Sequence, residues 1–556
     1  MKKFYCLLPI AYCLLPASTT NFTTQIELLY NFDRNKFHFE LTMLNKQIIK
    51  DTSRLPFRSP WFIIIIFSAL GLIGILNHSM WRDELNPWLI VRDSESLGDL
   101  IANIRYEGHP ILWYFSLALL RKIIDNPIIM QIFHLAITVV SVTIFCLYSP
   151  FNYQQKFLFS FGFFPFYEYL LISRNYAFSM LFIFAFCTIF STRKITYAYL
   201  AILLGLLANS SAYGLLVSFS LSLTLLAEFC FDSEHRQQYF SQSQKYDLFL
   251  SIIIIIFSFI LSIYIITPPT DSYLYGGLNN GWLMQLDIRH LLRSIGRIFG
   301  GYLLIIPQHK RWLDLIVCAI IALFIVILTL IKLSKKPVAL FFYIIGNCVI
   351  FAFTYLRFTG MPRHFGHFYL VLIAALWLGS YYQESIVLLN KFSIRPNSIT
   401  FVQKWHHIAL MLILYVQFGG GIYSFSRDLF VPFSASRETS QYIQEAKLDN
   451  EFIVASRDAN MAPLSGYLNR KFYYPELKKM GSFTLFKKGR QDVEQTEILN
   501  QINSLLKNQD EQKKILLILN QKLNVNRNDL KIVPIKDFQR NWVDSERYYL
   551  YWVDEA

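Results

Sequence analysis

Long uninterrupted apolar runs constrain the fold of this chain more than any other feature. They include "WFIIIIFSALGLIGIL" from Trp61, "LFLSIIIIIFSFILSIYIIT" from Leu248 and "LDLIVCAIIALFIVILTLIKL" from Leu313. Each run approaches the roughly 20 apolar residues that a helix needs to cross a bilayer. Of the 556 residues, 54% are hydrophobic and 16% are charged, which is more apolar surface than one soluble core can bury. The chain is therefore expected to be a polytopic α-helical membrane protein.

The positive charge of the chain is interpreted as a sign of membrane topology. The formal net charge is +14, which in a soluble protein would suggest a nucleic-acid partner. In a chain with many spans, Lys and Arg instead mark the cytoplasmic loops, so no nucleic acid is expected. An anionic lipid head group is a second partner that these charges would suit. The last of the 7 cysteines is Cys348, so no disulfide framework or zinc site is indicated in the polar C-terminal stretch.

Counting the apolar runs, with the basic loops placed inside, predicts about 11 spans. The expected spans are residues 61–77, 127–148, 157–172, 176–190, 198–207, 213–231, 248–267, 313–333, 338–356, 368–382 and 408–423. Residues 111–120 are too short to span and are expected to lie as a helix on the outer leaflet. Residues 291–307 are expected to form an interfacial or re-entrant segment.

Three parts of the chain follow from this pattern. Residues 1–59 are a cytoplasmic, low-complexity extension with a repeated "YCLLP", and Met43 is an alternative start. Residues 60–424 are the transmembrane domain, whose first outer loop is 78–126. Residues 425–556 are expected to form a small extracytoplasmic α/β domain. Its strands are predicted at "EFIVAS", "RKFYYP", "KILLILN" and "RYYLYWV", and a helix at "TEILNQINSLLKNQ".

Polar and ionisable side chains collect at the outer ends of the expected spans. The candidate site residues are Arg82, Asp83, Glu84, Glu107, His109, Glu168, Arg174, Tyr176, Arg357, Arg363, His364 and His367. Charged groups at membrane depth are costly and usually functional. Carboxylates beside arginines suit proton abstraction next to a bound phosphate.

Several of these candidates also have a purely structural explanation. Asp83 and Glu84 would serve as an ordinary helix cap, and Arg174 would extend its charge to the membrane surface. His364 and His367 would form a polar loop or an aromatic-packed pair. A metal site made by His364, His367 and one carboxylate stays open, because this spacing alone is weak evidence for a ligand set. The sequence requires no cofactor and leaves metal dependence undecided.

Three short motifs in chain order resemble a known family. They are "W-x-DE-x(2)-PW" at 81–88, "EGHP-x-LWY" at 107–114 and "SRNYA" at 173–177. This order is similar to that of the GT-C superfamily of membrane glycosyltransferases, in the branch with protein O-mannosyltransferases and lipid A aminoarabinose transferases. The likeness covers most of the chain. Many members carry a second proline after His-Pro, where this chain has Ile111, and the acceptor is therefore not indicated.

The resemblance implies an enzyme that moves a sugar from a polyprenyl-phosphate carrier to an acceptor hydroxyl. It implies a hexosyl- or pentosyltransferase in a bacterial plasma membrane, with its active site and C-terminal domain outside the cytoplasm. The acceptor would be a lipid, a glycan or a protein. Asp83 would be the general base, Glu84 would position the acceptor or tune that base, and Arg174 would hold the lipid phosphate. Arg357 and Arg363 are added as phosphate ligands from topology alone.

A transporter or flippase for polyprenyl-linked glycans is the main alternative. It would also have many spans and outer cations, but it should show internal repeats or broken helices at the membrane midplane. No convincing repeat is found in this chain, and a large outer α/β domain is less expected of a transporter. A structural membrane scaffold is a third reading, but it does not need an acidic pair beside the first span.

Overall fold

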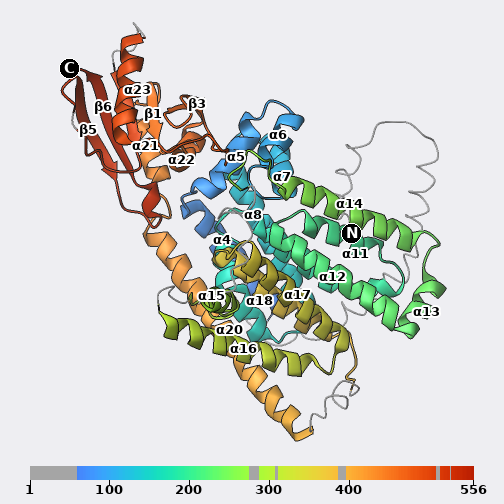
Figure 1. Ribbon diagram of the computed structural model, residues 1–556. Coiled ribbons are helices and arrows are strands. Elements are labelled where there is room, and N and C mark those ends of the chain that lie inside the picture. Colours follow the sequence, from blue (N-terminus) through green and yellow to red (C-terminus); the bar gives the residue numbers. More distant parts are fainter. Residues whose placement is uncertain (1–58, 275–286, 307–310, 386–395, 509–513, 526) are drawn as a thin grey trace. The chain divides into compact units, whose positions relative to one another are not determined.

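The computed structural model describes residues 59–274, 287–306, 311–385, 396–508, 514–525 and 527–556. The "YCLLP" repeat and Met43 lie outside the described residues. Residues 63–556 form one compact unit. Figure 1 shows that this unit contains the long helices and, near the C-terminus, a sheet with its own helices.

The long apolar runs form helices, as the sequence predicts. Seven of the described helices are long and apolar enough to cross a membrane: α4 (Pro60–Asn77), α8 (Ile128–Tyr148), α12 (Ala212–Phe231), α14 (Asp247–Ile266), α16 (Trp312–Leu333), α17 (Pro337–Leu356) and, over residues 401–430, α20 (Pro396–Phe430). Helix α14 leaves Phe257 65% exposed and Ile260 63% exposed. A continuous surface of this kind needs lipid around it. The chain is an integral, multi-pass membrane protein.

The expected number of spans exceeds these seven helices because four of the expected segments are shorter, more polar or broken. Three of the four are α10 (Tyr176–Thr188), α11 (Ala198–Ala208) and α18 (Pro362–Gly379). Helices α10 and α11 have 13 and 11 residues, and at about 1.5 Å per residue neither crosses a hydrocarbon core of about 30 Å alone. Helix α18 begins with the polar sequence "PRHFGH".

The last of these four segments is residues 157–172, and the prediction of a continuous helix there is wrong. The chain breaks there into α9 (Tyr153–Ser160) and a π-helix, η2 (Phe163–Glu168). Helix α20 packs on the break so closely that a Cβ on Gly421 would lie 2.3 Å from the carbonyl oxygen of Phe161. Only glycine permits this approach of two backbones.

The remaining helices of this part are shorter connections. They are α5 (Arg82–Asp93), α6 (Leu97–Ile104), α7 (Leu112–Arg121), η3 (Phe190–Lys194), α13 (Ser233–Gln242) and α15 (Ile288–Leu303). Helix α7 confirms that residues 111–120 form a helix too short to span. Helices α5, α6 and α7 all belong to the expected first outer loop.

The basic loops that were expected on the inner side meet at one end of the helices. Arg193 Nε and Glu228 Oε2, near the C-terminal end of α12, form an ion pair of 2.8 Å. Tyr382 donates its hydroxyl to Glu228 at 2.7 Å. Lys335 pairs with Glu384 at 2.8 Å. Helix α12 starts at Ala212. Its N-terminal end therefore marks the side of the bundle opposite to these basic loops.

Helix α20 leads into the C-terminal domain, a six-stranded sheet in the order β3-β2-β1-β4-β6-β5. The strands are β1 (Ile453–Ser456), β2 (Phe472–Tyr474), β3 (Lys479–Gly481), β4 (Lys514–Leu519), β5 (Leu530–Phe538) and β6 (Tyr548–Glu555), and the helices are α21 (Ser436–Glu445), α22 (Asp458–Leu468), α23 (Gln495–Asn508) and η4 (Asp544–Glu546). Strand β1 pairs in parallel with β2 and β4. Alternate residues of β1 face opposite layers: Ala455 packs with α21 and α22, and Val454 packs with α23.

All four predicted strands and the predicted helix of this domain are confirmed. Strands β3 and β5 were not predicted. Strand β3 has only three residues, and β5 is a largely exposed edge strand with a bulge after Pro534. Neither carries the alternation of apolar and polar residues that reveals a strand.

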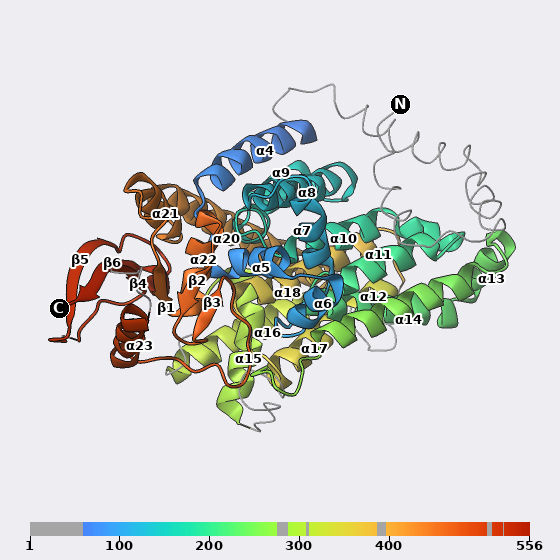
Figure 2. The same ribbon diagram turned by 90° about the horizontal axis from the view of Figure 1, so that it is seen from above.

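The C-terminal domain packs on the first outer loop, with α22 against α5 (Figure 2). The backbone N–H of Arg82 donates to Glu546 Oε1 at 2.9 Å, and the backbone N–H of Thr484 donates to Asn86 Oδ1 at 2.9 Å. These bonds hold the first two turns of α5 from the side of the sheet domain.

Candidate active site

Helix α5 carries the acidic pair of the first motif. Its N-terminal residue follows Trp81, whose backbone is extended, and the Glu84 carboxylate accepts the Trp81 N–H at 3.2 Å. Acidic residues in a first turn are favoured by the free N–H groups and by the helix dipole. The apolar residues Leu85, Trp88 and Leu89 are buried, so they hold the helix in place and leave Asp83 beside the cavity.

Asp83 is surrounded by arginines from three parts of the chain. Arg363 Nη2, at the start of α18, lies 2.8 Å from Asp83 Oδ2, and Arg174 Nη1 lies 3.5 Å from the same oxygen. Arg174 also donates to the backbone carbonyl of Asp83. Arg82 Nε is 3.6 Å from Asp83 Oδ1. The Asp83 side chain keeps 23% of its surface exposed, so it is accessible from the cavity.

These cations determine the charge of Asp83. Burial alone would raise the pKa of the carboxyl group, but Arg174, Arg363 and Arg82 outweigh it and hold that pKa below its usual value. Asp83 is therefore ionised at neutral pH. An ionised carboxylate in a cavity can accept a proton from a bound hydroxyl group.

His109 is held as a neutral hydrogen-bond acceptor. Its Nε2 lies 2.9 Å from Arg174 Nη2, and because a guanidinium can only donate, the imidazole nitrogen must accept. Burial, together with the charges of Arg174 and Arg363, lowers the pKa of His109 to about 3. The neutral ring consequently orients Arg174 without adding another positive charge.

Glu107 supplies a second carboxyl group of different character. Asn86 Nδ2 donates to Glu107 Oε1 at 3.3 Å. Burial raises the pKa of Glu107 to about 7, although the nearby charge of Arg174 opposes the shift. Near neutral pH a large fraction of Glu107 is protonated, whereas Asp83 is ionised. Two carboxyl groups whose environments separate their pKa values are typical of active sites.

A cavity of about 390 Å³ joins these groups. Nine of the twelve predicted site residues line it: Arg82, Asp83, Glu107, His109, Arg174, Tyr176, Arg357, Arg363 and His364. Tyr176 and His364 contact each other at 2.8 Å between the hydroxyl oxygen and Nε2. The C-terminal domain contributes Ala459, Thr484 and Phe486 to the wall. The cavity is thus shared by the transmembrane part and the sheet domain.

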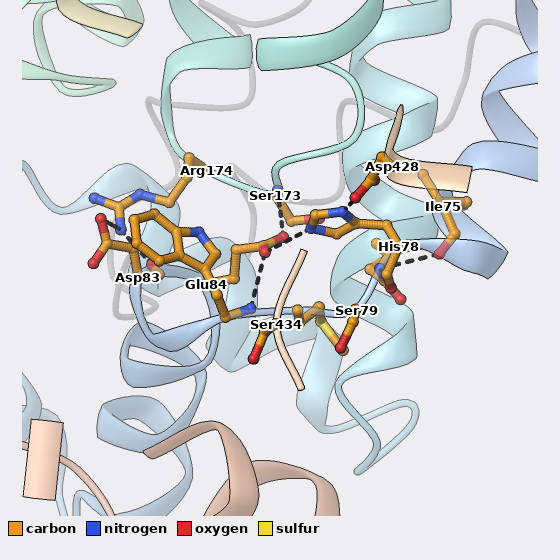
Figure 3. A network of polar contacts seen from close by, with 12 residues as sticks. Ile75, His78, Ser79, Asp83, Glu84, Ser173, Arg174, Asp428 and Ser434 are labelled. Atoms are coloured by element: carbon orange, nitrogen blue, oxygen red, sulfur yellow. Dashed lines mark hydrogen bonds and ion pairs between the residues drawn. The ribbon is translucent and has the colours of Figure 1, made fainter. Parts of the chain in front are cut away.

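Three predicted residues are placed away from the cavity. Glu84 is fully buried, and its carboxylate contacts His78 and the backbone N–H of Ser173 (Figure 3). Glu168 is 9% exposed at the end of η2, and His367 is 0% exposed within α18. None of the three lines the cavity. Glu84, which the resemblance assigned to positioning the acceptor, therefore contacts its neighbours in the protein and does not face the cavity.

The described residues contain no cluster of three or more His, Cys, Asp or Glu side chains arranged to hold a metal ion. His364 Nδ1 is occupied by the backbone N–H of Met361 at 2.8 Å, and His367 Nδ1 contacts the carbonyl oxygen of His364 at 3.1 Å. Within the described part of the chain, the metal site considered for His364 and His367 thus lacks its third ligand.

Several residues of the site were not anticipated. Asn86 bonds Glu107 on one side and Thr484 on the other, and His78 joins Glu84 to Asp428. His78 lies three residues before the first motif and five before Asp83, and a histidine so close to a membrane-depth acidic pair was a usable signal. Asp428 and Thr484 carried no signal of this kind.

Comparison with known proteins finds no family model and no curated protein that matches the sequence. Among solved structures, the chain is similar to the crystal structure of ArnT from Cupriavidus metallidurans bound to undecaprenyl phosphate. The similarity covers 88% of this chain and 97% of that chain, with 9% sequence identity and a TM-score of 0.45.

Proposed function

We propose that this protein is a membrane glycosyltransferase that moves a sugar from a polyprenyl-phosphate donor to an acceptor hydroxyl group. The observation that carries the proposal is the ionised Asp83 carboxylate, exposed in a cavity and held between Arg174 and Arg363. The site thus offers a proton acceptor beside cations that suit a phosphate leaving group. The order of the three sequence motifs supports the same reaction.

In this proposal Asp83 is the general base. The acceptor hydroxyl gives its proton to Asp83 as its oxygen attacks the anomeric carbon, and the bond between that carbon and the phosphate oxygen breaks. The leaving lipid phosphate takes the electron pair of the broken bond. Arg174 and Arg363 stabilise the charge that develops on the phosphate, because guanidinium groups match phosphate oxygens geometrically.

The ion pairs of Asp83 also suggest how the base becomes stronger when the donor arrives. A phosphate entering the cavity competes with Asp83 for Arg174 and Arg363. As these cations turn to the phosphate, the pKa of Asp83 rises from its depressed value. A base with a pKa nearer to neutral accepts a proton more effectively.

The neutral His109 and the partly protonated Glu107 have supporting roles in the proposal. His109 orients Arg174 by accepting from it. Glu107 can donate a hydrogen bond to a sugar oxygen, as a carboxylic acid in a buried site does. Ala459 and Thr484 of the C-terminal domain lie where they would restrict the acceptor. The cavity is proposed to open on the extracytoplasmic face, since the basic loops gather at the other end of the helices.

The test is reconstitution of the purified protein in liposomes with a polyprenyl phosphate carrying a radiolabelled sugar. Membrane extracts supply lipid, glycan and protein acceptors. The proposal expects free polyprenyl phosphate and labelled acceptor to appear together. Movement of the intact labelled donor across the bilayer, without release of polyprenyl phosphate, would instead favour the flippase.

A further inference from the structure

His78 lies between α4 and α5 and has carboxylates on both sides of its ring. Nε2 is 2.9 Å from Glu84 Oε2, and Nδ1 is 2.7 Å from Asp428 Oδ2. All three residues are buried, with exposures of 0%, 0% and 4%. Ionised carboxylates only accept hydrogen bonds, so the ring meets both by donating from both nitrogens. Figure 3 shows the His78 ring between the carboxylates of Glu84 and Asp428, and a ring that donates from both nitrogens is an imidazolium.

Glu84 connects His78 to the backbone that carries the proposed catalytic groups. Its Oε1 accepts the backbone N–H of Ser173 at 2.7 Å, and Ser173 immediately precedes Arg174. On α5, Glu84 is the direct neighbour of Asp83. One carboxylate consequently fixes the two backbones whose side chains meet at Arg174 and Asp83.

The other end of the network is anchored in α20 through Asp428. Charged and titratable side chains from several elements face the cluster or act on it: Arg427 of α20, His134 of α8, Tyr167 and Glu168 of η2, Arg437 of α21 and Tyr467 of α22. Arg437 donates to the backbone carbonyl of His78. The charges around the ring therefore come from both the helical part and the C-terminal domain.

We propose that His78 is a positioning residue for the transfer reaction, whose imidazolium ties α5 and the Ser173–Arg174 segment to α20 so that Asp83 and Arg174 face each other. This inference rests on the proposed function, because Asp83 is taken as the base. None of His78, Glu84 and Asp428 lines the cavity, so they act only through the groups that they hold.

The electrostatics of the cluster agree with this geometry. Burial would lower the pKa of His78, but Asp428 and Glu84 outweigh it and raise that pKa to about 10. The ring thus keeps its charge through the physiological range. Removal of one member of a buried ionic cluster leaves an uncompensated charge, which is strongly destabilising locally. Loss of His78 would leave two carboxylates facing each other, and they would separate or take up a proton.

The test compares His78→Gln and Asp428→Asn with a matched control, His235→Gln. His235 is 6% exposed and contacts the hydroxyl of Tyr197 at 2.7 Å, and it lies at the end of the helices away from the cavity. Full-length proteins in liposomes are assayed for sugar transfer as a function of pH. A displacement of about 1 Å at an active site can cost about 10²-fold in rate, so kcat should fall by up to roughly that factor in the two network variants.

A second readout separates positioning from general damage. If Arg174 moves away from Asp83, the pKa of Asp83 rises toward its ordinary value, and the acid limb of the pH–rate profile moves to higher pH. The control should keep the wild-type acid limb. Network variants that keep both the wild-type kcat and the wild-type acid limb would overturn the proposal. A lower kcat with an unchanged acid limb would also overturn the proposal, because general structural damage lowers kcat without changing the pKa of Asp83.

An assay that needs no turnover keeps this inference distinct from the proposed function. The infrared carboxyl band of Asp83 is identified as the difference between wild type and Asp83→Asn. The midpoint at which this band titrates with pH is then measured in the wild-type and Asp428→Asn backgrounds. A higher midpoint in the Asp428→Asn background supports the positioning role, and an unchanged midpoint overturns it. Absence of sugar transfer in the wild type would contradict the proposed function while leaving this titration interpretable.

Discussion

Asp83 and Arg363 are 280 residues apart in the chain, and their side chains meet at 2.8 Å. Asp83 comes from the first turn of α5, directly after the first membrane helix, and Arg363 comes from the first turn of α18. The fold brings these two turns to the same end of the helices. An ion pair between a cavity carboxylate and an arginine that also lines the cavity links the proposed base to the proposed phosphate site.

Arg174→Ala should weaken donor binding more than it weakens the fold. Charged hydrogen bonds contribute about 1.5–3 kcal/mol, so the KM for the polyprenyl-phosphate sugar should rise roughly 10–100-fold. The control is Arg121→Ala, at the end of α7, which removes an ion pair to Asp125 and hydrogen bonds to the backbone carbonyls of Val91 and Arg92. Equal KM values for the two variants would show that Arg174 only extends its charge to the membrane surface.

His109 gives a pH dependence with a definite sign. Its pKa falls from 6.5 in the unfolded chain to about 3 in the fold, so the unfolded state binds more protons between these values. The stability that the neutral ring supplies is present above pH 6.5 and is lost as the pH falls toward 3. In detergent, the Tm of the wild type should therefore decline relative to that of His109→Gln as the pH falls from 7 to 4. A constant difference between the two Tm values over this range would contradict the assignment.

Gly421 tests the packing of α20 on the break after α9. Gly421→Ala places a Cβ against the carbonyl oxygen of Phe161, at 2.3 Å before any adjustment, and overpacking costs about 1–3 kcal/mol. Gly419→Ala is the control, because nothing lies within 4 Å of its Cβ, and alanine in a helix should be neutral or stabilising by up to about 1 kcal/mol. Thermal unfolding in detergent measures both. Equal Tm values for the two variants would contradict the close contact.

The proposed orientation predicts which single cysteines a membrane-impermeant reagent reaches. In a background without Cys230 and Cys348, both exposed in the fold, cysteines at Glu95 in the first loop and Lys522 in the C-terminal domain should react in intact cells. A cysteine at Lys245, in the loop after α13, should react only after permeabilisation. The reverse pattern would place the cavity on the cytoplasmic side.

The sequence predicts the local features of the site well. Asp83, His109 and Arg174 each lie in a short motif at the end of an apolar run, and all three line the cavity. Charge at membrane depth is costly, which makes such positions visible without a structure. The four regular strands of the C-terminal domain are equally visible, because their apolar residues are continuous or alternate.

The direction of each side chain and the distant pairings could not be predicted in this way. Glu84 follows Asp83 in one helix, so at about 3.6 residues per turn the two side chains point about 100° apart. Once Asp83 faces the cavity, Glu84 turns into the protein toward His78. The contact of His78 with Asp428 spans 350 residues, and no local pattern announces it. Helix α20, which packs on the break at 157–172 through Gly421, is also remote in the sequence.

The most direct test of the account replaces the proposed base without changing its size. Asp83→Asn keeps the shape of the side chain but cannot accept a proton at neutral pH, whereas Asp99→Asn changes an aspartate of the same loop that does not line the cavity. The measurement is the initial rate at which labelled sugar leaves its polyprenyl phosphate in liposomes, with donor binding measured in parallel. General-base catalysis typically contributes about 10²–10⁴-fold, so the account predicts a loss of that size in Asp83→Asn, intact donor binding, and an unchanged rate in Asp99→Asn. Full transfer activity in Asp83→Asn would contradict it.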